Sequence, residues 1–187
     1  NESQRVSQQA FLNNLERGEA YLSMAPTLWD VTFRTAVAQA ELEDREMPGA
    51  YHRLGFDGPE GKIFIETTRP ELVPACVALV AHPDDERYQH LFGQTAKTPI
   101  FEVEVPIVAH RLAQIDKGSG IAMICTFGDV TDVVWWRELK LPMRPIIGFD
   151  GRIMSDGPKE VLTGPGADLY AQLAGKTVFS AKEILVG

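Results

Sequence analysis

Two short segments carry the side chains whose types and spacing could do chemistry. The first is Thr-Thr-Arg-Pro-Glu at residues 67–71, which gathers two hydroxyls, a guanidinium and a carboxylate on a backbone stiffened by proline. Such a cluster offers donors and acceptors to a polar ligand and to an attacking water molecule. A strand end with a local ion pair between Arg69 and Glu71 is the plain structural interpretation of the same residues.

The second segment is Cys-Thr-Phe-Gly-Asp-Val-Thr-Asp at residues 125–132. Here an apolar strand ends in a turn and a helix begins, and Asp129 is a natural N-cap for that helix. Asp132 lies about one turn further on, so both carboxylates can face one cavity beside the helix N-terminus. A carboxylate in that place could bind a cationic amino group, although capping alone also explains Asp129.

Other common catalytic and metal-binding patterns are absent from the sequence. There is no G-x-S-x-G, no Walker or G-x-G-x-x-G loop, and no C-x-x-C or H-x-x-x-H pair. The triplet Gly-Ser-Gly at residues 118–120 is interpreted as a plain turn. We therefore expect no metal, and two buried free thiols at Cys76 and Cys125.

Composition limits the class of protein. The 187 residues are 44% hydrophobic and 24% charged, which is typical of one soluble globular domain with flanking arms. With 18 basic and 26 acidic residues the net charge is −8, which disfavours a stand-alone nucleic-acid binder. An acidic domain can still act on the terminal nucleotide of an RNA that other domains hold. No apolar run approaches the roughly 20 residues of a membrane span, no secretory signal is present, and the initial Asn suggests a piece of a longer chain.

The surrounding patterns predict the elements that position the two segments. Alternation predicts a strand over residues 62–67 that leads into the first segment, after a turn at 57–61. An apolar strand at 121–126 and a helix at 129–139 enclose the second segment. Further strands are expected at 27–34, 52–56, 76–81, 94–98 and 103–109, with prolines 99 and 106 in edge-like positions. Helices are expected at 84–92, 168–173 and 181–186, the last two separated by Gly175, and a helical pattern covers 1–22 with a break at Gly18.

These elements predict an α+β fold around a small β-barrel or curled sheet, with short flanking helices. We divide the chain into an N-terminal flanking arm (1–50), a core (51–158) and a C-terminal helical flank (159–187).

The two segments, taken with three others, resemble the inserted editing domain of valyl-tRNA synthetases. The others are A-x-V-A-x-x-A-H-P-D-D-E-R-Y at 75–88, E-V-E-V-P-I-V-A at 102–109 and the triplet at 118–120. The flanks at 8–21 and 26–41 match as well, so the resemblance covers nearly the whole chain. Isoleucyl and leucyl enzymes share the Thr-Thr-Arg-Pro element, whereas the segments at 82–88 and 125–132 favour the valyl enzyme.

The sequence also departs from many members of this family. Trp-Asp-Val-Thr-Phe at 29–33 stands where many relatives have a Cys-Pro-x-Cys half zinc knuckle, so that metal is lost. Leu72 stands where many bacterial members have threonine, and residues 125–129 replace Thr-Pro-Ala-His-Asp. The H-I-G-H and K-M-S-K-S signatures of the ATP-dependent half are absent, so the resemblance implies no cofactor for this domain.

The resemblance implies hydrolysis of the ester of mischarged threonyl-tRNA(Val). Valine and threonine are nearly isosteric, and valyl-tRNA synthetases are the standard example of an apolar pocket that cannot strongly reject a hydroxyl. A second site that hydrogen-bonds the hydroxyl gives the stronger discrimination. The implied partners are the acceptor end of tRNA(Val) and the rest of a cytoplasmic synthetase.

The family also implies roles for individual residues. Asp132 binds the α-ammonium of the threonyl group, and Asp129 assists or contacts the hydroxyl or the ribose. Thr67 and Thr68 line the terminal adenosine and the attacking water, while Arg69 and Glu71 hold the loop and the nucleotide end. Three further residues shape the pocket: Lys117, Met123 and Cys125. No residue is an evident general base, so positioning of water and the vicinal hydroxyl of the tRNA are expected to contribute much of the catalysis.

Three alternatives remain open from the sequence. The chain could be a free-standing trans-editing deacylase with the same chemistry. It could be a non-catalytic tRNA-binding or docking module, which the net charge disfavours. It could also be the editing domain of an isoleucyl enzyme, which would prefer valyl-tRNA.

Overall fold

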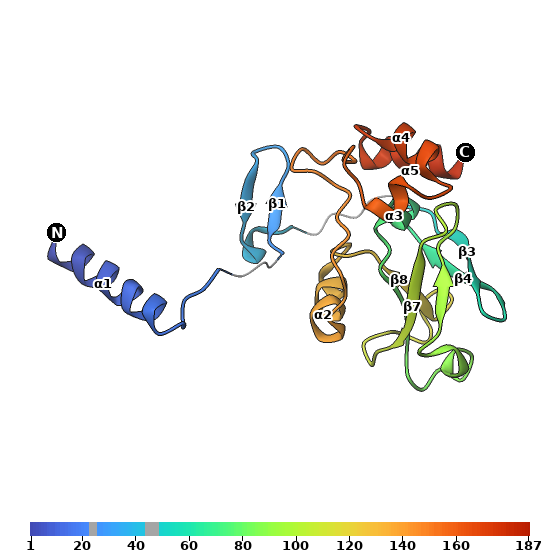
Figure 1. Ribbon diagram of the computed structural model, residues 1–187, viewed down its shortest axis with the longest axis horizontal. Coiled ribbons are helices and arrows are strands. Elements are labelled where there is room, and N and C mark those ends of the chain that lie inside the picture. The colour runs from blue at the N-terminus through green and yellow to red at the C-terminus, as the bar shows by residue number, and fades with distance from the viewer. Residues whose placement is uncertain (23–25, 44–48) are drawn as a thin grey trace.

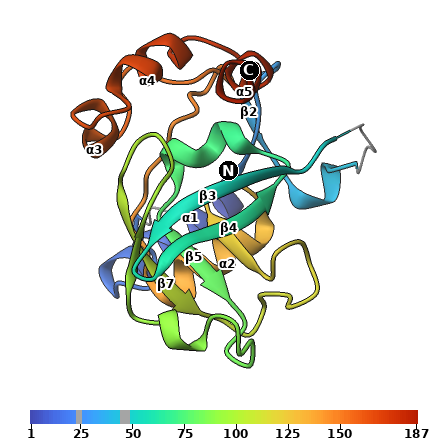
Figure 2. The same ribbon diagram turned by 90° about the vertical axis from the view of Figure 1, so that its right-hand side faces the viewer.

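A curled six-stranded sheet forms the body of the computed structural model, which describes residues 1–22, 26–43 and 49–187 (Figure 1). The strand order is β4-β3-β6-β7-β5-β8, and every pair is antiparallel except β5 with β7. Contacts between the two edge strands β4 and β8 nearly close the sheet into a barrel (Figure 2). This confirms the predicted α+β class. The strands are β3 (His52–Gly58), β4 (Gly61–Thr67), β5 (Ala78–Ala81), β6 (Thr95–Lys97), β7 (Glu104–Ala109) and β8 (Ile121–Ile124).

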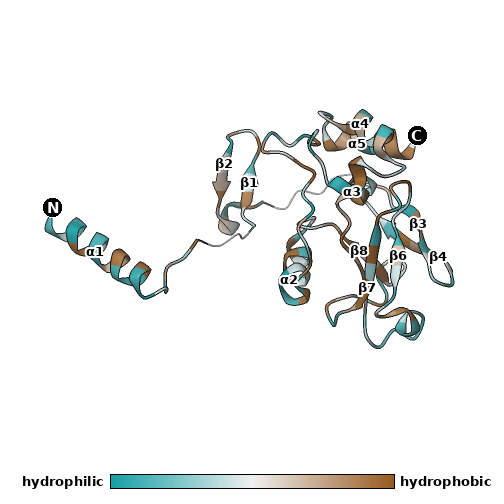
Figure 3. Cartoon of the chain, in the orientation of Figure 1, coloured by the Kyte–Doolittle hydropathy of each residue, from teal (hydrophilic) through white to brown (hydrophobic). Residues whose placement is uncertain are grey.

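The alternation predicted for residues 62–67 is present in β4. Ile63 and Ile65 point into the barrel and are buried, whereas Phe64 lies on the outer face. All four residues of β5 are buried, because the barrel interior covers one face of this strand and α2 (Val130–Leu139) covers the other. Figure 3 shows apolar residues along β7 and β8, in contrast to the mostly polar α1. The buried faces of these strands thus form the core that supports the rest of the fold.

Three C-terminal helices cover one end of the barrel (Figure 2). They are α3 (Lys159–Leu162), α4 (Ala167–Leu173) and α5 (Val178–Val186). The structure confirms two helices on either side of Gly175, which has a φ of +74°, and adds α3. Tyr170 and Leu173 of α4 belong to the same hydrophobic core as Phe56 of the barrel. The division of the chain at residues 50 and 158 stays a prediction.

The N-terminal elements differ in part from the predicted ones. Helix α1 (Glu2–Glu16) ends just before Gly18, which breaks the helix as predicted with a φ of +71°, and none of its residues is buried. The single strand predicted at 27–34 is wrong. Instead β1 (Leu28–Asp30) and β2 (Thr35–Val37) form a hairpin, because the Asp30 carboxylate accepts hydrogen bonds from the backbone N–H groups of Thr32 and Phe33 at 2.7 and 2.9 Å. A short 3₁₀ turn, η1 (Gln39–Glu41), follows.

The helix predicted at 84–92 fails for a local reason. Residues 84–92 do not form an α-helix; turns lead to the short 3₁₀ helix η3 (Gln89–Leu91). The Asp85 side chain binds the backbone N–H of Arg87 at 3.2 Å, and such bonds compete with helix formation. Pro106 takes the predicted edge-like position within β7, because it pairs only with Thr95 of β6 and pairing with β5 begins at Ile107. No helix among the described residues is long and apolar enough to cross a membrane.

Candidate active site

A cavity of about 240 Å³ lies where β4 and β8 approach each other. The end of β4 and the residues after it form one wall, and β8 with the start of α2 forms the opposite wall. The structure therefore brings the two predicted segments together. Of the predicted site residues, those that line the cavity are Thr67, Thr68, Arg69, Lys117, Met123, Cys125, Asp129 and Asp132.

Arg69 joins the two segments directly. Its guanidinium Nη1 donates to the carbonyl of Gly128 at 2.8 Å, across 59 positions of sequence. Its backbone N–H donates to Oγ1 of Thr67 at 3.0 Å, just before the 3₁₀ helix η2 (Pro70–Ala75) begins. Arg69 therefore fixes the distance between the two walls of the cavity.

Glu71 lies outside the cavity, behind Arg69. Its Oε1 accepts from Nε of Arg69 at 3.2 Å, so the local ion pair considered from the sequence is present. Its other oxygen is buried without a hydrogen-bond partner among the described residues. Glu71 therefore orients Arg69 in this structure and has no contact with the cavity itself.

Asp132 is the buried carboxylate of the site, with 6% of its surface exposed. Its Oδ2 accepts from the backbone N–H groups of Gly128 and Cys125 at 3.0 and 3.3 Å. Burial, followed by repulsion from Asp129, raises the pKa of Asp132 from the ordinary 3.8 to about 7, although the two N–H groups and Arg69 oppose this shift. The carboxyl therefore gains or loses its proton near neutrality, and a cation in the cavity would favour the ionised form.

Asp129 caps α2 as predicted. Its Oδ1 accepts from the backbone N–H of Asp132 at 2.8 Å, and the residue also borders the cavity. Capping leaves the other carboxylate oxygen of Asp129 without a role in the helix. The structural and the functional interpretation of Asp129 are therefore compatible.

The turn at residues 126–128 directs the two N–H groups at Asp132. Thr126 has a φ of +50°, which is rare for a β-branched residue, and it is buried. Its hydroxyl donates to the carbonyl of Ala75 at 3.3 Å and accepts from the backbone N–H of Arg144 at 3.0 Å. A Cβ added to Gly128 would lie 2.5 Å from Oδ2 of Asp132, so only glycine lets the backbone approach the carboxylate this closely.

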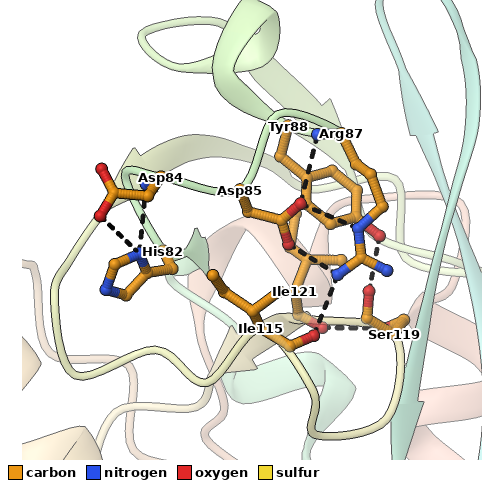
Figure 4. Close-up of polar contacts among 8 residues, drawn as sticks. All are labelled: His82, Asp84, Asp85, Arg87, Tyr88, Ile115, Ser119 and Ile121. Atoms are coloured by element: carbon orange, nitrogen blue, oxygen red, sulfur yellow. Dashed lines mark hydrogen bonds and ion pairs between the residues drawn. The ribbon is translucent and has the colours of Figure 1, made fainter.

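The His-Pro-Asp-Asp-Glu-Arg-Tyr segment holds a third wall in place (Figure 4). Arg87 makes two charge-assisted bonds to the buried Asp85 carboxylate at 2.8 and 2.7 Å, and donates to the carbonyl of Ile115 at 3.0 Å. The Tyr88 hydroxyl donates to the carbonyl of Ser119 at 2.8 Å. The hydrogen bonds from Arg87 lower the pKa of Asp85. These contacts fix the loop that places Lys117 at the cavity.

Several residues that line the cavity were not found from the sequence. Trp135 lies three positions after Asp132 on the same side of α2, and this helical spacing was an available signal. Thr131 also borders the cavity from α2. Other additions, among them Tyr51 and Leu112 to Gln114, come from loops, and no pattern in the sequence marks them.

Metal binding has no evident site in the part of the chain that the structure describes. No group of three or more His, Cys, Asp or Glu side chains there is placed to hold a metal ion. The segment at 29–33, which stands in the place of the half zinc knuckle, forms part of the β1–β2 hairpin and its turn.

Comparison with known proteins identifies close relatives. The chain is 73% identical over 185 residues to valine–tRNA ligase of Leifsonia xyli subsp. xyli, covering 99% of this chain and 22% of that protein. It is 66% identical to valine–tRNA ligase of Cutibacterium acnes and 68% identical to that of Thermobifida fusca, covering 99% and 98% of this chain and 21% of each relative.

The chain corresponds to one segment of valine–tRNA ligases. It spans about a fifth of the length of the relatives it matches. No family model matches the sequence. Among solved structures, a chain of the Agrobacterium radiobacter K84 agnB2 LeuRS–tRNA–LeuAMS ternary complex has a TM-score of 0.44 and 17% identity, covering 60% of this chain and 17% of that one. The identities of 66–73% to valine–tRNA ligases confirm the family resemblance noted from the sequence.

Proposed function

We propose that the chain is the editing domain of a valine–tRNA ligase and hydrolyses the ester of threonyl-tRNA(Val). The observation that supports this most is the buried Asp132, whose carboxylate borders a cavity of about 240 Å³ and has a pKa of about 7. A buried carboxylate of this kind needs a cationic partner to stay ionised, and the α-ammonium of an aminoacyl ester supplies one. The cavity of about 240 Å³ has room for the aminoacyl group of such an ester.

The surrounding residues can position the ester for attack by water. The hydroxyl oxygen of Thr67 accepts a bond from Arg69, which leaves its proton free to point at the cavity. Water adds to the ester carbonyl, and the bond from that carbon to the ribose oxygen breaks, which releases threonine and leaves the ribose hydroxyl on the tRNA. No covalent intermediate is needed. Burial raises the pKa of the Cys125 thiol well above its ordinary value, so this thiol stays protonated and is a poor nucleophile.

The same proposal implies two partners, the tRNA and the rest of the ligase. The remaining four-fifths of a valine–tRNA ligase would hold the body of the tRNA, which is compatible with the net charge of −8 in this chain. The reaction needs neither a metal nor a cofactor, because water is the only second reactant. The compartment would be the cytoplasm, where aminoacyl-tRNA is used.

A deacylation assay tests the proposal. The chain, alone and within a full-length valine–tRNA ligase, is incubated with threonyl-, valyl- and isoleucyl-tRNA, and release of the amino acid is measured. Threonyl-tRNA(Val) should be hydrolysed fastest, and Asp132→Ala should reduce this rate by at least about a hundredfold while the fold is kept. Asp168→Asn, which changes an exposed carboxylate of α4, is the control and should leave the rate unchanged.

Each alternative predicts a different result. A docking module would bind tRNA without hydrolysing it, and an isoleucyl editing domain would prefer valyl-tRNA. A free-standing deacylase would be fully active as the isolated chain. Normal hydrolysis by Asp132→Ala would refute the role given to that carboxylate.

A further inference from the structure

We infer that His110 is a positioning residue of the editing site, which fixes Trp135 and the adjacent loop as one wall of the amino-acid cavity. This inference rests on the proposed function. His110 is 8% exposed and directly follows β7, but it is not among the site residues predicted from the sequence. It does not border the cavity, so any influence on the reaction must pass through its neighbours.

Both parts of that wall donate to one nitrogen of His110. The indole N–H of Trp135 donates to Nδ1 at 3.0 Å, and the backbone N–H of Leu112 donates to the same atom at 3.2 Å. Trp135 and Leu112 line the cavity, as do the next two residues of the loop. Because Trp135 shares α2 with Asp132, His110 ties the loop to the helix that carries the proposed ammonium-binding carboxylate.

The hydrogen bonds on the two sides of the ring define the tautomer of His110. Two donors at Nδ1 require this nitrogen to be unprotonated, so the proton of the neutral ring is on Nε2. Nε2 donates to Oε2 of Glu138 at 2.8 Å, and Glu138 is half exposed on α2. The chain Glu138–His110–Trp135 thus begins at the protein surface and ends at the cavity, and it holds the indole in one orientation.

A fixed indole matters for the discrimination between threonine and valine. The two side chains differ by one hydroxyl in place of a methyl group, so selection depends on where the walls hold the aminoacyl group relative to its polar partners. A displacement of about 1 Å at a reacting group can cost on the order of a hundredfold in rate. A wall that can rotate should therefore lose selectivity more than it loses affinity for tRNA.

Two substitutions of His110 distinguish the roles of its two ring nitrogens. In His110→Asn the amide oxygen can replace Nδ1 as an acceptor for Trp135 and Leu112. In His110→Gln the longer side chain can reach Glu138 but offers no acceptor at the position of Nδ1. His90→Gln, at a half-exposed histidine, is the matched control.

The experiment measures two quantities for each variant. The first is the indole N–H resonance of Trp135 in the ¹⁵N-labelled chain, assigned among the three tryptophans by Trp135→Phe. The second is the ratio of kcat/KM for threonyl- and valyl-tRNA(Val) in full-length enzyme. His110→Gln should shift or broaden the resonance and reduce the ratio by roughly tenfold, whereas His110→Asn and His90→Gln should keep both near wild type.

The possible results distinguish the inference from the proposed function. If wild-type enzyme hydrolyses neither substrate, the proposed function fails. If it is selective and His110→Gln keeps the same ratio, the inference about His110 alone is refuted. A loss of folded protein lowers both rates equally and leaves the ratio unchanged, so it cannot imitate the expected result. If His110→Gln does not fold, Glu138→Gln provides the same readout from the exposed end, and an unchanged resonance and ratio there would overturn the inference.

Discussion

At the scale of single residues, the buried carboxylate of Asp132 lowers the stability of the folded chain at neutral pH. Its pKa is about 7 in the folded chain and near 3.8 when the chain is unfolded, so the folded state binds more protons between these values. Stability therefore decreases as the pH rises from about 4 to 7, and stays at the lower level above pH 7. Such a cost is typical of residues that are kept for function.

Asp132→Asn should for this reason stabilise the folded chain at high pH. The amide oxygen can still accept from Gly128 and Cys125, while no charge is buried. We expect the free energy of unfolding to rise by on the order of 2–3 kcal/mol at pH 8, and the gain to vanish near pH 4. Urea unfolding of both proteins from pH 4 to 8 measures this difference. A gain of the same size at every pH would show that Asp132 is not the group that titrates.

Gly128 offers a second test at the residue scale. A methyl group there would lie 2.5 Å from the Asp132 carboxylate and 3.4 Å from Leu72, so Gly128→Ala must displace the carboxylate or the turn. We expect deacylation to fall by about tenfold to a hundredfold. Gly49→Ala is the control, because its Cβ would meet nothing within 4 Å. If both variants keep wild-type rates in the deacylation assay, the turn does not position Asp132.

The sequence could predict the two segments of the site but not the contacts between distant residues. The two segments stood out because hydroxyls and charges cluster at element ends, and Asp129 could be predicted as a cap from its place alone. The bond from Arg69 to Gly128 spans 59 positions and that from Trp135 to His110 spans 25, so no local pattern carries them. These contacts depend on how the sheet curls and on where α2 packs against it, and no local pattern states either.

At the scale of elements, the segment at 82–88 shows how a local rule can mislead. Proline, early acidic residues and a final glycine favour a helix there. The carboxylate of Asp85 instead accepts hydrogen bonds from the guanidinium and from the backbone N–H of Arg87. The segment instead acts as a clamp on the loop at 115–120. By contrast, β4 and α2 were predicted almost to the residue, because buried and exposed residues alternate along β4 and Asp129 caps α2.

The clamp leads to a prediction about the loop. Asp85→Asn removes the charge that orients Arg87, so the Arg87 bond to the Ile115 carbonyl should weaken. Amide hydrogen exchange at Gly120, whose N–H donates to Lys117, should become several-fold faster, and Tm should fall by roughly 2–4 °C. Asp84→Asn changes the neighbouring exposed carboxylate and should alter neither. Equal exchange in the two variants would mean that the loop is held by other contacts.

At the scale of the whole molecule, the two ends of the chain differ in how much they bury. The C-terminal helices complete the barrel core: Tyr170 is fully buried, and its hydroxyl donates to the carbonyl of Met154 at 3.0 Å. They also reach the site, because Nζ of Lys182 donates to the carbonyl of Thr68 at 2.7 Å. Helix α1 has no buried residue. The region predicted as a C-terminal flank is thus packed into the core, while α1 makes no contribution to it.

Truncation at each end tests this asymmetry. Removing residues 1–22 should leave Tm and deacylation by the chain within error of the intact form, because no buried apolar surface is lost. Removing residues 159–187 should abolish cooperative unfolding, because it exposes the end of the barrel that Val161, Tyr170 and Leu173 cover.

Substitution of Tyr170 tests the same packing in smaller steps. Tyr170→Ala should lower the free energy of unfolding by about 3–5 kcal/mol, whereas Tyr170→Phe should lower it by about 1 kcal/mol through the lost hydrogen bond to Met154. Calorimetry of the four variants measures these effects, and a shortened chain 1–158 with a sharp transition at the wild-type Tm would show that the barrel folds without its helices.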